Sequence, residues 1–127
     1  MENLSSYEIR TDSKGEYIFI KSKSVISLQD KSDLLDKIAQ DSSLPRNLRV
    51  IDDATGSKLT FNISGVRKLM QKATQAASGY DSIKYAVILN TALYVAYVIF
   101  ADTISANSKF NIKVFPGFKE AQIWLNR

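Results

Sequence analysis

An uncharged apolar run at residues 85–101 (YAVILNTALYVAYVIFA) limits the fold of this chain more than any other feature. A membrane-spanning helix needs about 20 apolar residues, whereas this run is shorter and is interrupted by the polar pair Asn90-Thr91. A buried strand that ends before Asn90, followed by a helix that begins after Thr91, explains the run better. We therefore expect no membrane span, and we expect the strand to lie at the centre of a sheet that is covered on both faces.

The rest of the chain alternates between the two-residue period of strands and the wider spacing of helices. We expect strands at 7–10, 16–21, 48–54, 83–89 and 110–115, and helices at 28–41, 63–77, 92–107 and 118–125. The order β-β-α-β-α-β-α-β-α predicts an α/β fold, with a mostly parallel, mixed five-stranded sheet, four helices and an antiparallel first strand. Ser27, and Asn62 or Thr60, are placed to cap the first two helices. Residues 1–127 are expected to form one domain.

The chain contains no cysteine and no histidine. This absence excludes disulfides, thiolate nucleophiles, Ser-His catalysis and the usual zinc ligands. The net charge of +4 is spread along the chain, whereas a nucleic-acid-binding face would gather basic residues on one side. We therefore expect no enzyme activity, no cofactor, no metal and no nucleic-acid partner. The first residues lack the apolar segment of a signal peptide, which favours a cytoplasmic protein.

The end of the chain has a specific pattern. Residues 115–125 follow F-x-x-x-x-E-A-x-x-W-L directly after an alternating strand at 110–115, and an apolar strand at 84–89 leads into the preceding helix. In these features the chain resembles the STAS superfamily over residues 7–127. That superfamily contains bacterial anti-sigma-factor antagonists and many small STAS-like proteins. The resemblance implies a non-enzymatic, cytoplasmic bacterial regulatory domain that binds a protein partner such as a kinase or an anti-sigma factor.

The resemblance also points to one serine. STAS antagonists are switched by phosphorylation of a serine in a D-S-S-G or D-S-T-G motif, at the start of the helix after the third strand. The comparable segment here is Asn62-Ile63-Ser64-Gly65, so Ser64 is the candidate phosphorylation site. Asn62 stands where the motif has aspartate, and Ile63 stands where it has the first hydroxyl residue. A phosphate at a helix start would meet free backbone N–H groups, but the favoured interpretation is a serine that only begins a helix.

Polar residues also follow two of the expected strands. Asp52 and Asp53 end one strand and Asn90 follows another, and ligands of open α/β sheets gather at such carboxyl ends. These three residues are therefore a candidate ligand site. Adjacent strand residues point to opposite faces, so only one of the two aspartates can face a given ligand. Loop and cap hydrogen bonding is the favoured interpretation, and metal binding is not expected.

The helix expected at 92–107 carries no charge from Thr91 to Ala101. We expect five of its residues to cover the sheet: Leu93, Ala96, Tyr97, Phe100 and Ile104. Another side of the helix would then present Tyr94, Val95, Val98 and Ile99, where a surface helix normally carries polar residues. Exposed apolar patches mark contact sites. We therefore predict that these four residues form an interaction surface for a homodimer, a protein partner or an apolar ligand, unless the C-terminal helix covers them.

Three functions stay open. The favoured hypothesis is a regulatory protein-interaction domain of the STAS-like type that forms a homodimer. The second is a carrier of a small apolar ligand or lipid, because some STAS-like proteins are grouped with lipid-binding folds. The third is an anti-sigma-factor antagonist switched by phosphorylation of Ser64.

Overall fold

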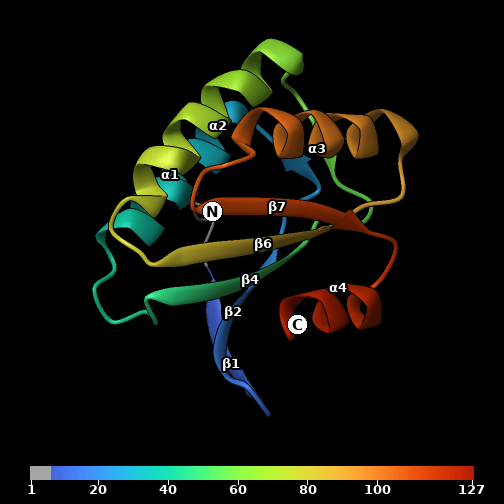
Figure 1. The fold of residues 1–127 in the computed structure, drawn as a ribbon. Helices are drawn as coiled ribbons and strands as arrows, with labels where there is room; N and C mark the ends of the chain where they lie inside the picture. The colour runs from blue at the N-terminus through green and yellow to red at the C-terminus, as the bar shows by residue number, and fades with distance from the viewer. Residues whose placement is uncertain (1–6) are drawn as a thin grey trace.

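A single five-stranded sheet organises the protein (Figure 1), which is seen here in a computed structural model that describes residues 7–127. The strand order is β1 (Glu8–Asp12), β2 (Gly15–Lys21), β4 (Asn47–Asp53), β6 (Ser82–Ile88) and β7 (Phe110–Phe115). β1 pairs with β2 in antiparallel fashion, and every other pairing is parallel. The predicted α/β class and mixed five-stranded sheet are confirmed. Each strand pairs with the next long strand along the chain, as short right-handed crossovers favour.

Helices cover both faces of this sheet, but unequally (Figure 1). The four helices are α1 (Leu28–Gln40), α2 (Ile63–Ala77), α3 (Ala92–Ser105) and α4 (Phe118–Leu125). The first three lie on one face and enclose the larger core, whereas α4 lies on the other face over a smaller core. Side chains of a strand alternate between the two faces. In β4, for example, Val50 packs towards α1–α3 and Ile51 packs towards α4.

Local signals in the sequence set the starts of two helices. Ser27 and Asp30 form a reciprocal capping box at the start of α1, in which the Ser27 hydroxyl accepts from the Asp30 backbone N–H at 3.0 Å and the Asp30 carboxylate accepts from the Ser27 N–H at 2.8 Å. The side chain of Asn62 accepts from the backbone N–H groups of Ser64 and Gly65 at the start of α2. Asn62, rather than Thr60, is therefore the cap.

A second, two-stranded sheet was not expected. β3 (Val25–Ile26) pairs in parallel with β5 (Lys58–Leu59), and neither segment was among the expected strands. Two backbone hydrogen bonds flank this pairing, from Lys58 to Ser24 at 2.8 Å and from Thr60 to Ile26 at 3.0 Å. Two-residue strands are too short to show a hydrophobic period. The pairing ties the start of α1 to the segment that leads into α2.

Arg49 on β4 joins distant parts of the chain. Its guanidinium donates to both carboxylate oxygens of Asp12, each at 2.9 Å, and to the side-chain oxygen of Asn126 at 2.6 Å. It also donates to the backbone oxygen of Gly15 at 2.9 Å. The guanidinium of Arg49 thus makes a bidentate, charged contact with the Asp12 carboxylate. These hydrogen bonds lower the pKa of Asp12 to about 2. The β1–β2 hairpin and the end of α4 are thus fixed to the same side chain.

The apolar run at residues 85–101 forms the second half of β6 and most of α3. Across residues 7–127, no helix combines the length and the apolar character that crossing a membrane requires.

Candidate functional site

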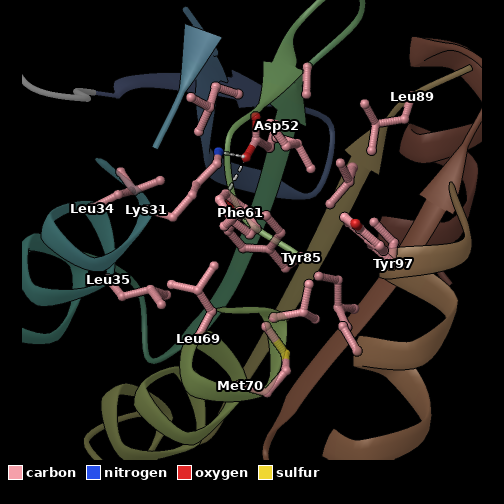
Figure 2. A pocket seen from close by; sticks show the side chains of 18 of the residues that line it. Lys31, Leu34, Leu35, Asp52, Phe61, Leu69, Met70, Tyr85, Leu89 and Tyr97 are labelled. Atoms are coloured by element: carbon pink, nitrogen blue, oxygen red, sulfur yellow. Dashed lines mark hydrogen bonds and ion pairs between the residues drawn. The ribbon is translucent and has the colours of Figure 1, made fainter. Parts of the chain in front are cut away.

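A cavity of about 100 Å³ lies between the sheet and the layer formed by α1, α2 and α3 (Figure 2). It opens beside the ends of β4 and β6, the edge of a parallel sheet at which ligands gather. Its wall is almost entirely apolar. Side chains from each of the three helices line it, among them Leu34, Leu69, Met70, Val98 and Ala101.

Three polar side chains form one end of this cavity: Lys31, Asp52 and Tyr85. Asp52 is 1% exposed, yet its carboxylate is well satisfied. It accepts hydrogen bonds from the Tyr85 hydroxyl at 2.6 Å, from the Ser22 hydroxyl at 2.6 Å and from the Lys31 ammonium at 2.5 Å. A buried carboxylate is tolerated only when it is paired and hydrogen-bonded in this way. We call Lys31, Asp52 and Tyr85 the polar end of the cavity.

Each member of the polar end comes from a different element. Asp52 lies near the end of β4 and faces α1–α3, because it is two residues after the inward-facing Val50. Tyr85 lies on the neighbouring strand β6 and points to the same face. Lys31 follows the capping box in the first turn of α1 and reaches back towards the sheet. The fold therefore brings together residues that are far apart in the sequence.

The electrostatics of the polar end keep Tyr85 protonated. Complete burial, then the negative charge of Asp52 and its hydrogen bond, raise the pKa of the Tyr85 hydroxyl well above 10. Lys31 and Asp52 carry opposite charges in direct contact, so the polar end has no net charge. An arrangement of this kind can orient a polar group on an otherwise apolar molecule.

The strand-end residues that we predicted as a ligand site do not meet. Asp52 faces the cavity, whereas Asp53 lies on the opposite face, pairs with Lys21 at 3.2 Å and accepts from the backbone of Thr55. Asn90 is exposed after β6 and does not line the cavity. The expectation that adjacent aspartates diverge is correct. Within residues 7–127, no three His, Cys, Asp or Glu side chains are grouped closely enough to hold a metal ion.

Sequence reasoning missed Lys31 and Tyr85. In the sequence, Lys31 is one of two lysines in an expected helix, and Tyr85 is one residue of an apolar strand, so neither indicates a site. The one available signal is Asp52 itself, because a carboxylate that ends a buried strand on its inner face needs donors nearby. The signal indicates that partners exist, but it does not identify them.

Ser64 is exposed in the first turn of α2. Its backbone N–H donates to the Asn62 side chain at 3.1 Å. The first turn of α2 contains no acidic residue, so no carboxylate there would repel a phosphate. Gly65 is required at the next position, because a Cβ atom there would lie 2.9 Å from the Cβ atom of Phe61. Ser64 therefore lies within the helix start that Asn62 caps, and its exposed side chain is accessible to modification.

The structure corrects the orientation that we expected for α3. Val98, expected on the outer side, is 8% exposed and lines the cavity, whereas Leu93, expected on the sheet, is 57% exposed. Ala96 is exposed too, and Ile99 is exposed at 57%, as expected. The helix approaches the sheet through Val98 and the small residues Ala101 and Ser105. Because α3 is apolar all round, its pattern contains no preferred direction from which the buried side could be predicted.

Tyr94 and Val95 are half-buried and pack against the core, so they belong to the flanks of α3 and not to its exposed side. The C-terminal helix does not cover α3, because α4 lies on the other face of the sheet (Figure 1). The alternative in which α4 covers the apolar surface of α3 is therefore wrong.

A solved structure shares this architecture. It is the crystal structure of an uncharacterised protein of the DUF3478 family, with a SpoIIAA-like fold, from Shewanella loihica PV-4. The two chains are 16% identical, the match covers 98% of each, and the TM-score is 0.64. No family model matches the sequence, and no curated protein matches it. At this identity the likeness shows the fold alone, so the chain has the SpoIIAA-like, STAS-like fold that the sequence resemblance implied.

Proposed function

We propose that this protein is a non-enzymatic regulatory domain of the STAS-like type that acts by binding a protein through the exposed side of α3. We define this exposed side as Leu93, Ala96 and Ile99, which recur at three-residue spacing and are all exposed. The observation that carries the proposal is an uncharged helix surface that displays two large aliphatic side chains to solvent. An apolar surface of this kind is typical of a contact site.

A second copy of the same chain is the partner that the surface fits best. A symmetric homodimer places one patch against itself. Charged patches repel each other in such a contact, whereas the exposed side of α3 has no charge to bring together. Beside this surface, Arg67 of α2 stacks on Phe100 of α3, and Asp102 of α3 pairs with Lys113.

The test measures molecular mass in solution by light scattering over a range of protein concentrations. We expect the unaltered chain to show twice its 14.2 kDa mass. Ile99→Glu should show the mass of one chain, because a buried glutamate without a partner is costly. Ile123→Glu is the matched control: Ile123 is 56% exposed on α4, on the opposite face of the sheet, and this variant should still form dimers.

Two outcomes would contradict the proposed self-contact. One is a mass of a single chain for the unaltered protein at every concentration. The other is a dimer that survives in Ile99→Glu while circular dichroism shows that both variants are folded. Since Ile99 is already exposed to solvent, the glutamate should not disturb the folded chain by itself.

A further inference from the structure

The cavity beneath α3 has the properties of a ligand site that is independent of the exposed side of that helix. Its volume is about 100 Å³. An apolar cavity of about 150 Å³ in another protein takes up benzene, so this cavity suits a molecule of similar or slightly smaller size. The wall is formed by aliphatic and aromatic side chains, which offer such a molecule contact without hydrogen bonds.

The polar end adds a directional feature to this apolar space. The Lys31 ammonium has three N–H groups, and the structure pairs it with two acceptors, Asp52 and Ser22. The Tyr85 hydroxyl donates to Asp52, and its oxygen keeps the capacity to accept. One donor and one acceptor at the same end of the cavity match a hydroxyl group, and the donor alone matches a carbonyl oxygen.

The charges of the polar end determine which ligands are excluded. Lys31 and Asp52 neutralise each other, so the cavity offers no uncompensated charge to an ion. A carboxylate or an ammonium group placed in the apolar wall would lose its hydration without gaining a counterion. From the size, the apolar wall and this neutrality we infer that the cavity binds a small, uncharged, largely apolar molecule, with one hydroxyl or carbonyl group directed at Lys31 and Tyr85.

Entry is expected between the start of α2 and the start of α3. Phe61, which precedes α2, and Tyr97 of α3 both line the cavity and are only partly buried (Figure 2). These rings, together with the partly buried Lys31 and Leu59, form the part of the wall that adjoins solvent. Thr91 makes no side-chain cap to the first turn of α3, so no capping hydrogen bond must break when that end of the helix moves.

The test follows the amide NMR spectrum of isotope-labelled protein while cyclopentanol is added, with the anion cyclopentanecarboxylate as the charged comparison. We expect saturable shifts around the cavity with cyclopentanol and none with the carboxylate. Ala101 is 2% exposed and lines the cavity, so Ala101→Leu should fill the space and weaken binding at least roughly tenfold. Ala106→Leu, the same change at the exposed C-cap of α3, should leave the affinity unchanged.

Because Ala101→Leu can overpack the core, a second variant makes an independent test. Tyr85→Phe keeps the ring and removes the hydroxyl, so it should weaken binding of cyclopentanol while binding of the hydrocarbon cyclopentane stays the same. Absence of saturable shifts up to the solubility limit of cyclopentanol, or equal affinity in the unaltered chain and both variants, would overturn the inference. The readout does not depend on molecular mass, so it is separate from the test of self-association.

Discussion

The hydroxyl of Tyr85 on β6 donates a 2.6 Å hydrogen bond to the carboxylate of Asp52 on β4, at one end of a cavity whose wall is almost entirely apolar. Lys31 of α1 supplies the opposite charge. Two ionised groups and a phenol are thus held together beside a cavity, where burying them is costly unless each is satisfied.

Removal of Lys31 should destabilise the protein strongly. The Lys31 side chain is 15% exposed and that of Asp52 is 2% exposed, so Lys31→Met leaves a buried carboxylate without its counterion. We expect a loss of about 3 kcal/mol in the free energy of unfolding, measured with urea. The control is Lys21→Met, which breaks the solvent-exposed pair with Asp53 and should cost less than about 1 kcal/mol. Equal losses in the two variants would contradict the role of the buried pair.

Stability should fall at alkaline pH because of Tyr85. Burial, the charge of Asp52 and its hydrogen bond raise the pKa of Tyr85 well above 10, so the folded state retains a proton that the unfolded state loses. Above about pH 10 each such tyrosine lowers the free energy of unfolding by about 1.4 kcal/mol per pH unit. The pKa values of Tyr7 and Tyr80 are raised as well and contribute in the same direction.

Urea titrations at pH 9, 10 and 11 check this slope. Tyr85→Phe should be less stable at neutral pH, by about 2 kcal/mol for the lost hydrogen bond to a charged group. Its stability should then decline less steeply than that of the unaltered chain as the pH rises. A parallel decline in the two proteins would show that Tyr85 ionises equally in the folded and unfolded states.

Acid should weaken the contact between Asp12 and Arg49. The hydrogen bonds from Arg49 lower the pKa of Asp12 from 3.8 to about 2, and both side chains are 12% exposed. The stabilisation is complete above about pH 4 and is lost as the pH falls towards 2, which amounts to about 2 kcal/mol. Asp12→Asn should lack this part of the acid dependence. The remaining loss of stability in acid should persist, because the folded state also lowers the pKa values of Asp30, Asp41 and Asp53. Circular dichroism during acid titration of both proteins should show that Asp12→Asn loses less stability between about pH 4 and pH 2 than the unaltered chain does.

A negative charge at Ser64 should stabilise α2. The residue is exposed in a first turn that lacks acidic side chains, where the helix dipole favours an anion. Ser64→Glu should raise the free energy of unfolding by about 0.5 kcal/mol. Ser78→Glu, at the other end of the same helix, should lower it.

Modification of Ser64 is a separate question with a direct measurement. Phosphate mapping by mass spectrometry, after incubation with kinases from the source organism, should find label on Ser64 if the chain is a phospho-switched antagonist. Label confined to other residues would remove that hypothesis. It would leave the stabilising effect of Ser64→Glu intact, because the helix dipole acts on any negative charge.

Most of the architecture could be predicted from the sequence, because its signals are local. Strand alternation, helical spacing and the caps at Ser27 and Asn62 each depend on a few neighbouring residues, and the structure contains the expected strands and helices. The pairing of β3 with β5 could not be predicted. Each of these strands has two residues, and their pairing depends on how the surrounding elements are already folded.

The candidate site was less predictable than the fold. Asp52 was identified from its position at a strand end, but its partners Lys31 and Tyr85 are 21 and 33 residues away in the sequence. Their proximity depends on the packing of α1 against the sheet and on the register of β4 with β6. The outward direction of Val98 was predicted wrongly for a related reason. On a uniformly apolar helix, the buried side is decided by the neighbours and not by the helix itself.

The position of α4 after all the strands of the sheet has a consequence for biosynthesis. Of the helices in the described residues, α4 alone covers its side of the sheet, where it meets Ile51, Ala86 and Ile88. Until residues 118–125 have left the ribosome, these side chains remain in contact with water on a sheet whose other side is already covered. Between the emergence of β7 and that of α4, the nascent protein should therefore be most prone to aggregate or to be held by chaperones.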